Sequence, residues 1–152
     1  MDIEQTDYLI STDPARLDLA FLCRTLAATY WAHDRPRQVV EESLRHSLCF
    51  GVYRKATGEQ VGFARVVTDQ ATFSWVCDVV IDERYRRQGL GKWLMACVVS
   101  HPHVRHTTSL LGTKDAHGLY ERYGYRRSEG MRRPRDGAGE TVTGPSVSAP
   151  TN

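Results

Sequence analysis

The sequence lacks any long hydrophobic segment. No apolar run approaches the roughly 20 residues that a helix needs to span a bilayer. The first residues, MDIEQTDY, are acidic and polar, so they do not resemble a secretory signal. Charge of one sign is also scarce, because 20 basic residues against 18 acidic ones leave a formal charge of +2. We therefore expect a soluble cytoplasmic protein without a membrane partner, and not one that coats nucleic acid.

Cysteine is sparse as well. The 4 cysteines lie far apart in hydrophobic runs and form no Cys-x-x-Cys pair (Cys23, Cys49, Cys77 and Cys97). This pattern favours buried free thiols in a reducing compartment over zinc or disulfide chemistry. His101, His103 and His106 lie close together, but Pro102 interrupts them and no cysteine or carboxylate is near. We expect no metal site there.

What the chain does contain is sufficient for one domain with a core, since 41% of its 152 residues are hydrophobic. Asp13 and Pro14 predict the start of a first helix, which leucines at helical spacing continue. A second amphipathic helix has an apolar face from Val39 to Leu44. Residues 30–34 connect the two helices.

The middle of the chain is rich in β-branched and aromatic residues. Three such runs, at 48–53, 61–67 and 73–81, are separated by short polar links. Strand-forming runs with short links predict an antiparallel meander of three strands.

The sequence after the meander alternates between helical and extended patterns. A helix is predicted from the glycines at 89–91, a short strand near 108–111, and another helix over 115–123 that stops at Gly124. The expected order is helices, meander, helix, strand, helix, strand. We predict an α+β fold with a mixed, mostly antiparallel sheet flanked by helices.

The end of the chain is poor in large apolar side chains. After Tyr125 only Met131 could support a final strand, so we expect the last strand to be weak or missing. Residues 136–152 are mainly Gly, Thr, Ser, Pro and Ala, which predicts a flexible tail after a single domain at 1–135. An uncovered sheet edge invites pairing, and a homodimer is one arrangement that would satisfy it.

Two closely spaced glycines, Gly89 and Gly91, stand where a strand is expected to turn into a helix. Glycines at such a turn let consecutive backbone N–H groups converge on an anion, aided by the helix dipole. Spacing excludes two familiar phosphate loops: Leu94 occupies the third glycine of the dinucleotide fingerprint, and Trp93 stands where a P-loop needs Ser or Thr. A turn without a ligand is the alternative, but the strand, helix and flanking arginines favour phosphate.

The segment RRQGLG at 86–91 resembles the R/Q-x-x-G-x-G/A signature of the GCN5-related N-acetyltransferase (GNAT) family. The preceding VVID at 79–82 resembles the fourth strand of that family, and the likeness extends over residues 50–125. It implies the acyl-CoA N-acyltransferase fold, acetyl-CoA as cosubstrate, a pyrophosphate held by the loop amides, and pantetheine paired with the strand. The cofactor positions that the resemblance implies are Val79, Val80, Ile81, Arg86, Arg87, Gln88, Gly89, Leu90, Gly91, Lys92, Thr113 and Ala116.

A second segment, TKDAHGLYERYGY at 113–125, resembles the N-x-x-A-x-x-L-Y-x-x-x-G-F segment of the same family. Thr113 replaces the usual asparagine and Tyr125 the usual phenylalanine. The resemblance implies that Tyr120 is the general acid that protonates the departing thiolate of coenzyme A. A tyrosine of the core is the alternative.

The attacking amine must lose a proton, because an alkylammonium has a pKa of about 10. Asp78 is the first candidate for the proton acceptor, since a carboxylate is unusual in an apolar strand. It could instead bind the ammonium, or form a salt bridge with Arg65 on the neighbouring strand.

The connection between the first two helices supplies the candidate acceptor site. In the family this loop commonly walls the acceptor pocket, which makes Tyr30, Trp31, His33 and Arg35 substrate-site candidates. An exposed loop position for His33, and core packing for Tyr30 and Trp31, are the alternatives.

The leading hypothesis is an acyltransferase that moves the acetyl group of acetyl-CoA to a primary amine of a small molecule, amino-acid derivative or peptide. Attack is expected to be direct, within a ternary complex. One alternative is a module that binds acyl-CoA without turnover, favoured by Thr113 and the weak last strand. Another is a nucleic-acid-associated protein that uses the arginines at 122, 126, 127, 132, 133 and 135.

Overall fold

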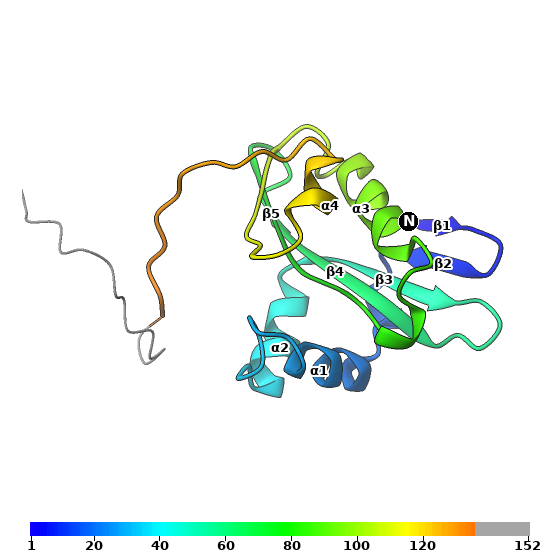
Figure 1. Cartoon of the computed structure of the whole chain (residues 1–152). Helices are drawn as coiled ribbons and strands as arrows, with labels where there is room; N and C mark the ends of the chain where they lie inside the picture. The colour runs from blue at the N-terminus through cyan, green and yellow to red at the C-terminus, as the bar shows by residue number, and fades with distance from the viewer. Residues whose placement is uncertain (136–152) are drawn as a thin grey trace, which may run out of the picture.

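The computed structural model of the chain describes residues 1–135, which form one six-stranded sheet between two layers of helices (Figure 1). The strands lie in sequence order across the sheet, and all neighbours are antiparallel except the last pair. This confirms the predicted α+β class. The strands are β1 (Asp2–Glu4), β2 (Tyr8–Ser11), β3 (Leu48–Arg54), β4 (Gln60–Thr68), β5 (Phe73–Ile81) and β6 (Thr108–Leu111).

The predicted meander is present as β3, β4 and β5, and the short strand at 108–111 as β6. The hairpin of β1 and β2 was not predicted, because both strands are short and β1 is largely polar. A backbone hydrogen bond from Gln5 N to Tyr8 O closes its turn at 2.9 Å. The sheet therefore begins with a hairpin and not with the helices that the sequence led us to expect.

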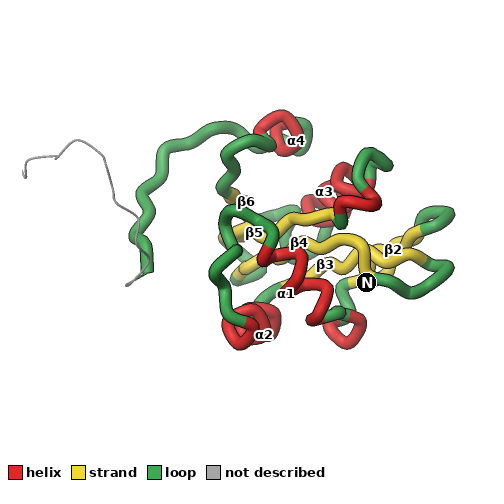
Figure 2. Tube along the Cα trace, turned by 60° about the horizontal axis from the view of Figure 1, so that its bottom comes forward, coloured by secondary structure: helices red, strands yellow, loops and turns green. Residues whose placement is uncertain are grey.

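Helices α1 (Leu19–Ala27) and α2 (Arg37–Arg45) cover one face of the sheet, and α3 (Leu90–Ser100) covers the other (Figure 2). On the first face, buried side chains of α1 such as Phe21 and Leu22 pack with Phe63 and Val80. On the second, α3 contributes buried residues including Leu94 to the larger core. Burial of apolar area in these two layers is the main force that holds the sheet between the helices.

The first helix begins later than predicted. Asp13 caps a separate 3-10 turn, Pro14–Arg16, by accepting a hydrogen bond from Ala15 N at 2.9 Å. Asp18 caps α1 itself, because its carboxylate accepts from Phe21 N at 3.0 Å. The sequence thus contains two consecutive caps, and the earlier one belongs to the shorter element.

Strand β5 carries a bulge at Asp78. Arg65 of β4 pairs with Cys77 and Phe63 pairs with Val80, so one extra residue of β5 lies between these pairs. Asp78 has φ +53°, an uncommon conformation for a non-glycine residue. The extra residue shifts the alternation of side chains, so that Val80 packs toward α1 and α2.

Strands β5 and β6 separate after a short parallel stretch. Their pairing runs from Phe73 with Thr108 to Val76 with Leu111 and then stops. Within the described part of the chain, the edge of β5 from residue 77 to 81 has no strand on the β6 side. This edge offers backbone groups to a ligand that lies along it as an added strand.

Helix α4 (His117–Glu121) is shorter than the predicted helix over 115–123, and the chain turns after it at Gly124, which has φ +85°. Between residues 122 and 135 the chain forms no further strand, in accord with the expected weakness of the last one. The flexible tail predicted at 136–152 lies outside the described residues. None of the helices within residues 1–135 combines the length and the hydropathy that a membrane crossing requires.

The four cysteines are free thiols, as expected. Cys49 and Cys97 are buried, and Cys23 and Cys77 are half-buried. Among the histidines near the end of α3, His101 Nδ1 accepts a hydrogen bond from His103 N at 3.1 Å. Within residues 1–135, no group of three or more His, Cys, Asp or Glu side chains is arranged to hold a metal ion.

Candidate active site

The loop between β5 and α3 contains a series of backbone amides without an acceptor. Asp82 caps a short 3-10 turn, Glu83–Tyr85, and the chain then turns into α3 through Arg87 (φ +64°) and Gly89 (φ +78°). Inside residues 1–135, no hydrogen bond engages the amide N–H groups of residues 87–92. Six successive donors at a helix N-terminus form a site suited to an anionic group.

The side chains of this loop anchor it and leave the amides accessible. Leu90 is buried in the core, and Gln88 Oε1 accepts a hydrogen bond from the hydroxyl of Tyr8 at 2.8 Å. The amide of Arg86 donates to Glu83 O at 3.4 Å and its Nε donates to Ile81 O at 3.1 Å, and its contact with the cosubstrate stays a prediction. Arg86 thus contributes mainly to the shape of the loop, and the free amides begin at Arg87.

Tyr120 lies half-buried on α4, beside Tyr125 at a ring-centroid distance of 6.1 Å. Burial is the largest cause that raises the pKa of Tyr120 to about 12, and Tyr125, Tyr30 and Asp115 add to it. Within the described chain, its hydroxyl makes no hydrogen bond. The phenol is therefore protonated at neutral pH, and its raised pKa makes it a weaker acid than an exposed tyrosine.

The turn before α4 is held by Thr113, whose hydroxyl oxygen accepts a hydrogen bond from Ala116 N at 3.0 Å. This contact gives Thr113 a structural role at the position where the family usually has asparagine. The hydroxyl of Tyr123 donates to the carbonyl of Lys92 and joins the turn after α4 to the first turn of α3. The two predicted motifs, at 86–92 and 113–125, are thus brought together.

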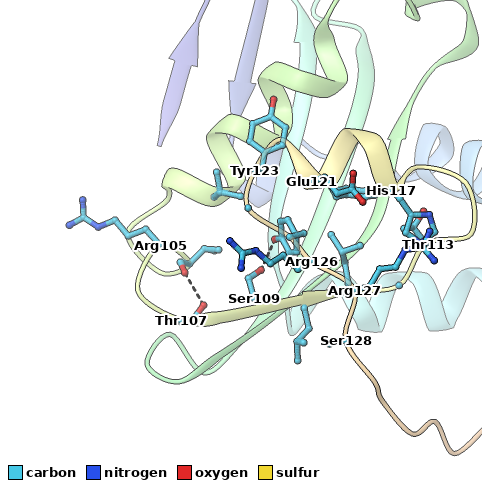
Figure 3. A pocket seen from close by; sticks show the side chains of 18 residues that line it. Arg105, Thr107, Ser109, Thr113, His117, Glu121, Tyr123, Arg126, Arg127 and Ser128 are labelled. Atoms are coloured by element: carbon cyan, nitrogen blue, oxygen red, sulfur yellow. Dashed lines mark hydrogen bonds between the residues drawn. The ribbon is translucent and has the colours of Figure 1, made fainter.

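A cavity of about 670 Å³ lies between β6, α4 and the segment that follows α4 (Figure 3). Tyr120 and Thr113 are the predicted site residues that border it, and no residue of 79–92 does. Ser109 and Tyr125 form a hydrogen bond of 2.6 Å in its wall. The cavity is therefore separate from the amides of the phosphate loop and adjoins the candidate acid from another side.

Asp78 is buried at the centre of a polar cluster. Its Oδ2 accepts hydrogen bonds from Arg35 Nη1 and Arg65 Nε, both at 2.8 Å, and its Oδ1 accepts from Trp31 Nε1 at 3.1 Å. Burial alone would raise the pKa of Asp78, but the hydrogen bonds and charges of the two arginines outweigh it and lower the pKa below its ordinary value. The carboxylate is held in its charged form.

These contacts include the salt bridge to Arg65 that we considered as the alternative to a catalytic role for Asp78. A general base needs a pKa near the working pH, and the arginines move the pKa of Asp78 away from that range. The geometry therefore favours the structural role. That Asp78 accepts the proton of the amine remains a prediction.

The connection between α1 and α2 lies against this cluster. Arg35 and Trp31 bind Asp78, while Tyr30 packs edge-on against Trp31 at 4.9 Å and accepts a hydrogen bond at its hydroxyl from Lys114 N at 3.3 Å. Three of the four predicted acceptor residues are thus brought toward β5 or the turn before α4. The fourth, His33, is exposed, and its Nδ1 lies 3.1 Å from Tyr30 O.

Two contacts of this region were missed from the sequence. Arg35 was assigned to the acceptor pocket but not recognised as an ion-pair partner of Asp78. Lys114 was not assigned at all, although its ammonium lies 4.7 Å from the centre of the Tyr30 ring. Both contacts join segments far apart in the chain, so no local sequence pattern predicts them. The one feature of the sequence that could have indicated Lys114 is its own positive charge, directly after Thr113.

Replacing Asp78 by asparagine is expected to destabilise the fold by about 3 kcal/mol, because it leaves two largely buried guanidinium groups without their counter-ion. Chemical denaturation at neutral pH measures the loss. Since the folded pKa is lowered, the stabilisation is present above the ordinary carboxyl pKa near 3.8 and is lost as the pH falls through the folded value.

The matched control for this variant is Asp34→Asn. Asp34 also pairs with an arginine, Arg135, at 3.2 Å, but both side chains are about 60% exposed. An exposed pair of this kind contributes at most about 1 kcal/mol. Equal unfolding midpoints for Asp78→Asn and the wild type would show that the cluster does not stabilise the chain.

The chain is similar to known proteins. A family model described as an acetyltransferase (GNAT) domain matches residues 45–127. A Gibberella zeae protein named as an acetyltransferase is 33% identical over 151 residues, covering 83% of this chain and 85% of that protein.

The chain is also similar to solved structures. The crystal structure of a Xanthomonas campestris protein assigned to the GNAT family has a TM-score of 0.81 and 39% identity, covering 89% of this chain and 98% of that one. A GNAT acetyltransferase from Elizabethkingia anophelis, solved with acetyl-CoA bound, has a TM-score of 0.61 and 16% identity. It covers 82% of this chain and 80% of its own, and this similarity concerns the fold alone.

Proposed function

Because the chain belongs to the GNAT acetyltransferase family, we propose that it transfers the acetyl group of acetyl-CoA to a primary amine by direct attack in a ternary complex. The observation that carries this proposal is that, within residues 1–135, the amides at 87–92 have no acceptor and the edge of β5 at 77–81 has no strand on the β6 side. Diphosphate and pantetheine are the groups that these two features fit. Acetyl-CoA supplies an activated acyl thioester when it is bound.

The residues that fit the cosubstrate divide into two sets. The amides of Arg87 to Lys92 suit the diphosphate, and the backbone of Val79, Val80 and Ile81 suits the pantetheine amides. A test of the fit comes from Gly91, where an added Cβ would meet only Ile81 Cγ1, at 3.9 Å. The first turn of α3 therefore has open space beside Gly91.

Tyr120 is proposed as the general acid. As the C–N bond forms and the C–S bond breaks, its phenol gives a proton to the sulfur, and the proton released from the new amide nitrogen restores the phenol through water. No metal ion or covalent enzyme intermediate enters this balance. Alignment of the two substrates supplies much of the remaining rate enhancement.

The rate of acetyl transfer is expected to rise with pH and to show no decline below about pH 10. Deprotonation of the amine increases the reactive fraction, whereas the pKa of Tyr120, raised to about 12, keeps the acid protonated throughout. Initial rates of thiol release between pH 6 and 10 measure this profile. A decline centred near pH 8 would assign the acid to another group.

The experiment that tests the function is a thiol-release screen of acetyl-CoA against a broad panel of amines. The proposal predicts coenzyme A release that depends on a particular amine and yields its N-acetyl product by mass spectrometry.

A second candidate function is a module that binds acetyl-CoA without turnover. The absence of a strand between residues 122 and 135 favours it, because relatives usually complete the acceptor side of the sheet there. This candidate predicts measurable affinity for acetyl-CoA and no thiol release with any amine.

A further inference from the structure

The cluster around Asp78 holds more positive than negative charge. Arg35 and Arg65 bring two guanidinium groups, and Asp78 is the one carboxylate of residues 1–135 that binds them. The side chains of the three are 19%, 14% and 1% exposed. A charge that is largely removed from water is stabilised by a counter-charge, so the cluster favours the approach of another anionic group.

Within residues 1–135, Arg65 has one guanidinium nitrogen, Nη2, without a partner, whereas Arg35 has a whole side of its guanidinium available. Arg65 uses Nε for Asp78 and Nη1 for Ser47 Oγ, which lies 3.1 Å away. Arg35 uses only Nη1 for Asp78, and residues 1–135 provide no partner for its Nε or Nη2. These two nitrogens form one side of the guanidinium, which is the geometry that binds both oxygens of a carboxylate.

Two exposed aromatic rings belong to the same cluster, because Trp31 binds the carboxylate that Arg35 binds and Tyr30 packs against Trp31. Trp31 is 42% exposed and Tyr30 is 45% exposed, although both are fixed in place, one by Asp78 and the other by Lys114. Fixed rings in contact with solvent suit an apolar or aromatic group of a ligand. The ammonium of Lys114 over the Tyr30 ring adds positive charge to the same wall.

The wall also contacts the turn before α4, the helix that carries the candidate acid Tyr120, since the hydroxyl of Tyr30 accepts a hydrogen bond from Lys114 N at 3.3 Å. An amine substrate held near Tyr120 would therefore place the rest of its molecule toward Arg35, Trp31 and Tyr30. In an amino acid the amine and the carboxylate are separated by one carbon atom, so a carboxylate bound by Arg35 would hold the amine close to this cluster.

We propose that the acceptor is an amino acid, or a derivative with a free carboxylate, whose carboxylate binds Nε and Nη2 of Arg35 and whose apolar side chain packs on Trp31 and Tyr30. The inference rests on the proposed acetyl transfer and specifies its substrate class.

The test compares each amino acid with its decarboxylated counterpart: phenylalanine with phenethylamine, tryptophan with tryptamine, and leucine with isoamylamine. Within each pair the side chain is the same and only the carboxylate differs. The wild type is expected to favour the carboxylate member by at least about 10-fold in kcat/KM, as a charge-assisted pair of hydrogen bonds supports.

Arg35→Gln is expected to reduce this ratio to near one, with an unchanged dissociation constant for acetyl-CoA. The matched control is Arg45→Gln on α2, where the arginine is exposed and pairs with Glu42; it should retain the wild-type ratio. Thermal unfolding of both variants separates a loss of fold from a loss of selectivity, and the wild-type ratio itself needs no variant.

The outcomes distinguish the two proposals. Equal or faster acetylation of the decarboxylated amines by the wild type would overturn the carboxylate assignment while acetyl transfer stands. A wild-type preference that survives in Arg35→Gln would assign the carboxylate to another residue and overturn the role of Arg35. No thiol release with any amine would overturn both proposals together.

Discussion

Gly91→Asp is expected to weaken acetyl-CoA binding by about 100-fold, whereas Gly91→Ala should bind as the wild type does. Gly91 lies in the first turn of α3, among the free amides, and has no positive φ that would require glycine. A unit charge about 4 Å from another costs about 4 kcal/mol at a protein surface. The aspartate side chain can turn partly away from the bound anion, which lowers the cost to about 2.7 kcal/mol. This free energy corresponds to a roughly 100-fold higher dissociation constant.

The Gly91→Ala variant separates the effect of side-chain size on binding from the effect of negative charge. Its Cβ would meet only Ile81 Cγ1, at 3.9 Å, which is an ordinary contact. Gly89 is less suitable for this comparison, because its φ of +78° makes any side chain strained. Isothermal titration calorimetry of the Gly91 variants gives both dissociation constants. Equal affinities for Gly91→Asp and Gly91→Ala would show that no anionic group binds at this turn.

Tyr120→Phe is expected to lower kcat by about 100-fold or more, with an unchanged dissociation constant for acetyl-CoA. General acid catalysis contributes roughly this factor, and the removed hydroxyl makes no hydrogen bond within residues 1–135 that would support the fold. The raised pKa of Tyr120, about 12, means that the wild type holds the proton at every pH of the assay.

The control for Tyr120→Phe is Tyr125→Phe. Tyr125 lies beside Tyr120 and is similarly half-buried, but its hydroxyl is engaged by Ser109 at 2.6 Å. Phenylalanine is also the usual residue of the family at that place. Tyr125→Phe should therefore retain most of its kcat. A Tyr120→Phe enzyme with more than half of the wild-type kcat would remove Tyr120 from the chemistry.

Much of the fold could be predicted because its main elements are encoded locally. The runs at 48–53, 61–67 and 73–81 became β3, β4 and β5, and the glycines at 89–91 mark the start of α3. Each of these patterns depends on residues within one element. The N-terminal hairpin was missed because β1 has three residues and one partly buried side chain, Ile3, which is too little for a recognisable alternation.

The candidate site was predictable where it consists of backbone and less so where it consists of side chains. The free amides at 87–92 follow from glycine positions. In contrast, the bulge at Asp78 depends on pairing between β4 and β5, and it directs the carboxylate toward Arg35 and Trp31. A regular alternation would have placed the side chains of β5 differently. Such contacts arise from tertiary structure and leave no pattern in the sequence.

The measurement that tests the central claim most directly is an amide ¹H–¹⁵N titration of the 17.2 kDa chain with coenzyme A and, separately, with pantetheine. If the amides of residues 87–92 bind the diphosphate, their resonances shift strongly with coenzyme A and little with pantetheine. Resonances of residues 79–81 should shift with both ligands. Identical responses of residues 87–92 to the two ligands, or no response to coenzyme A, would contradict the account.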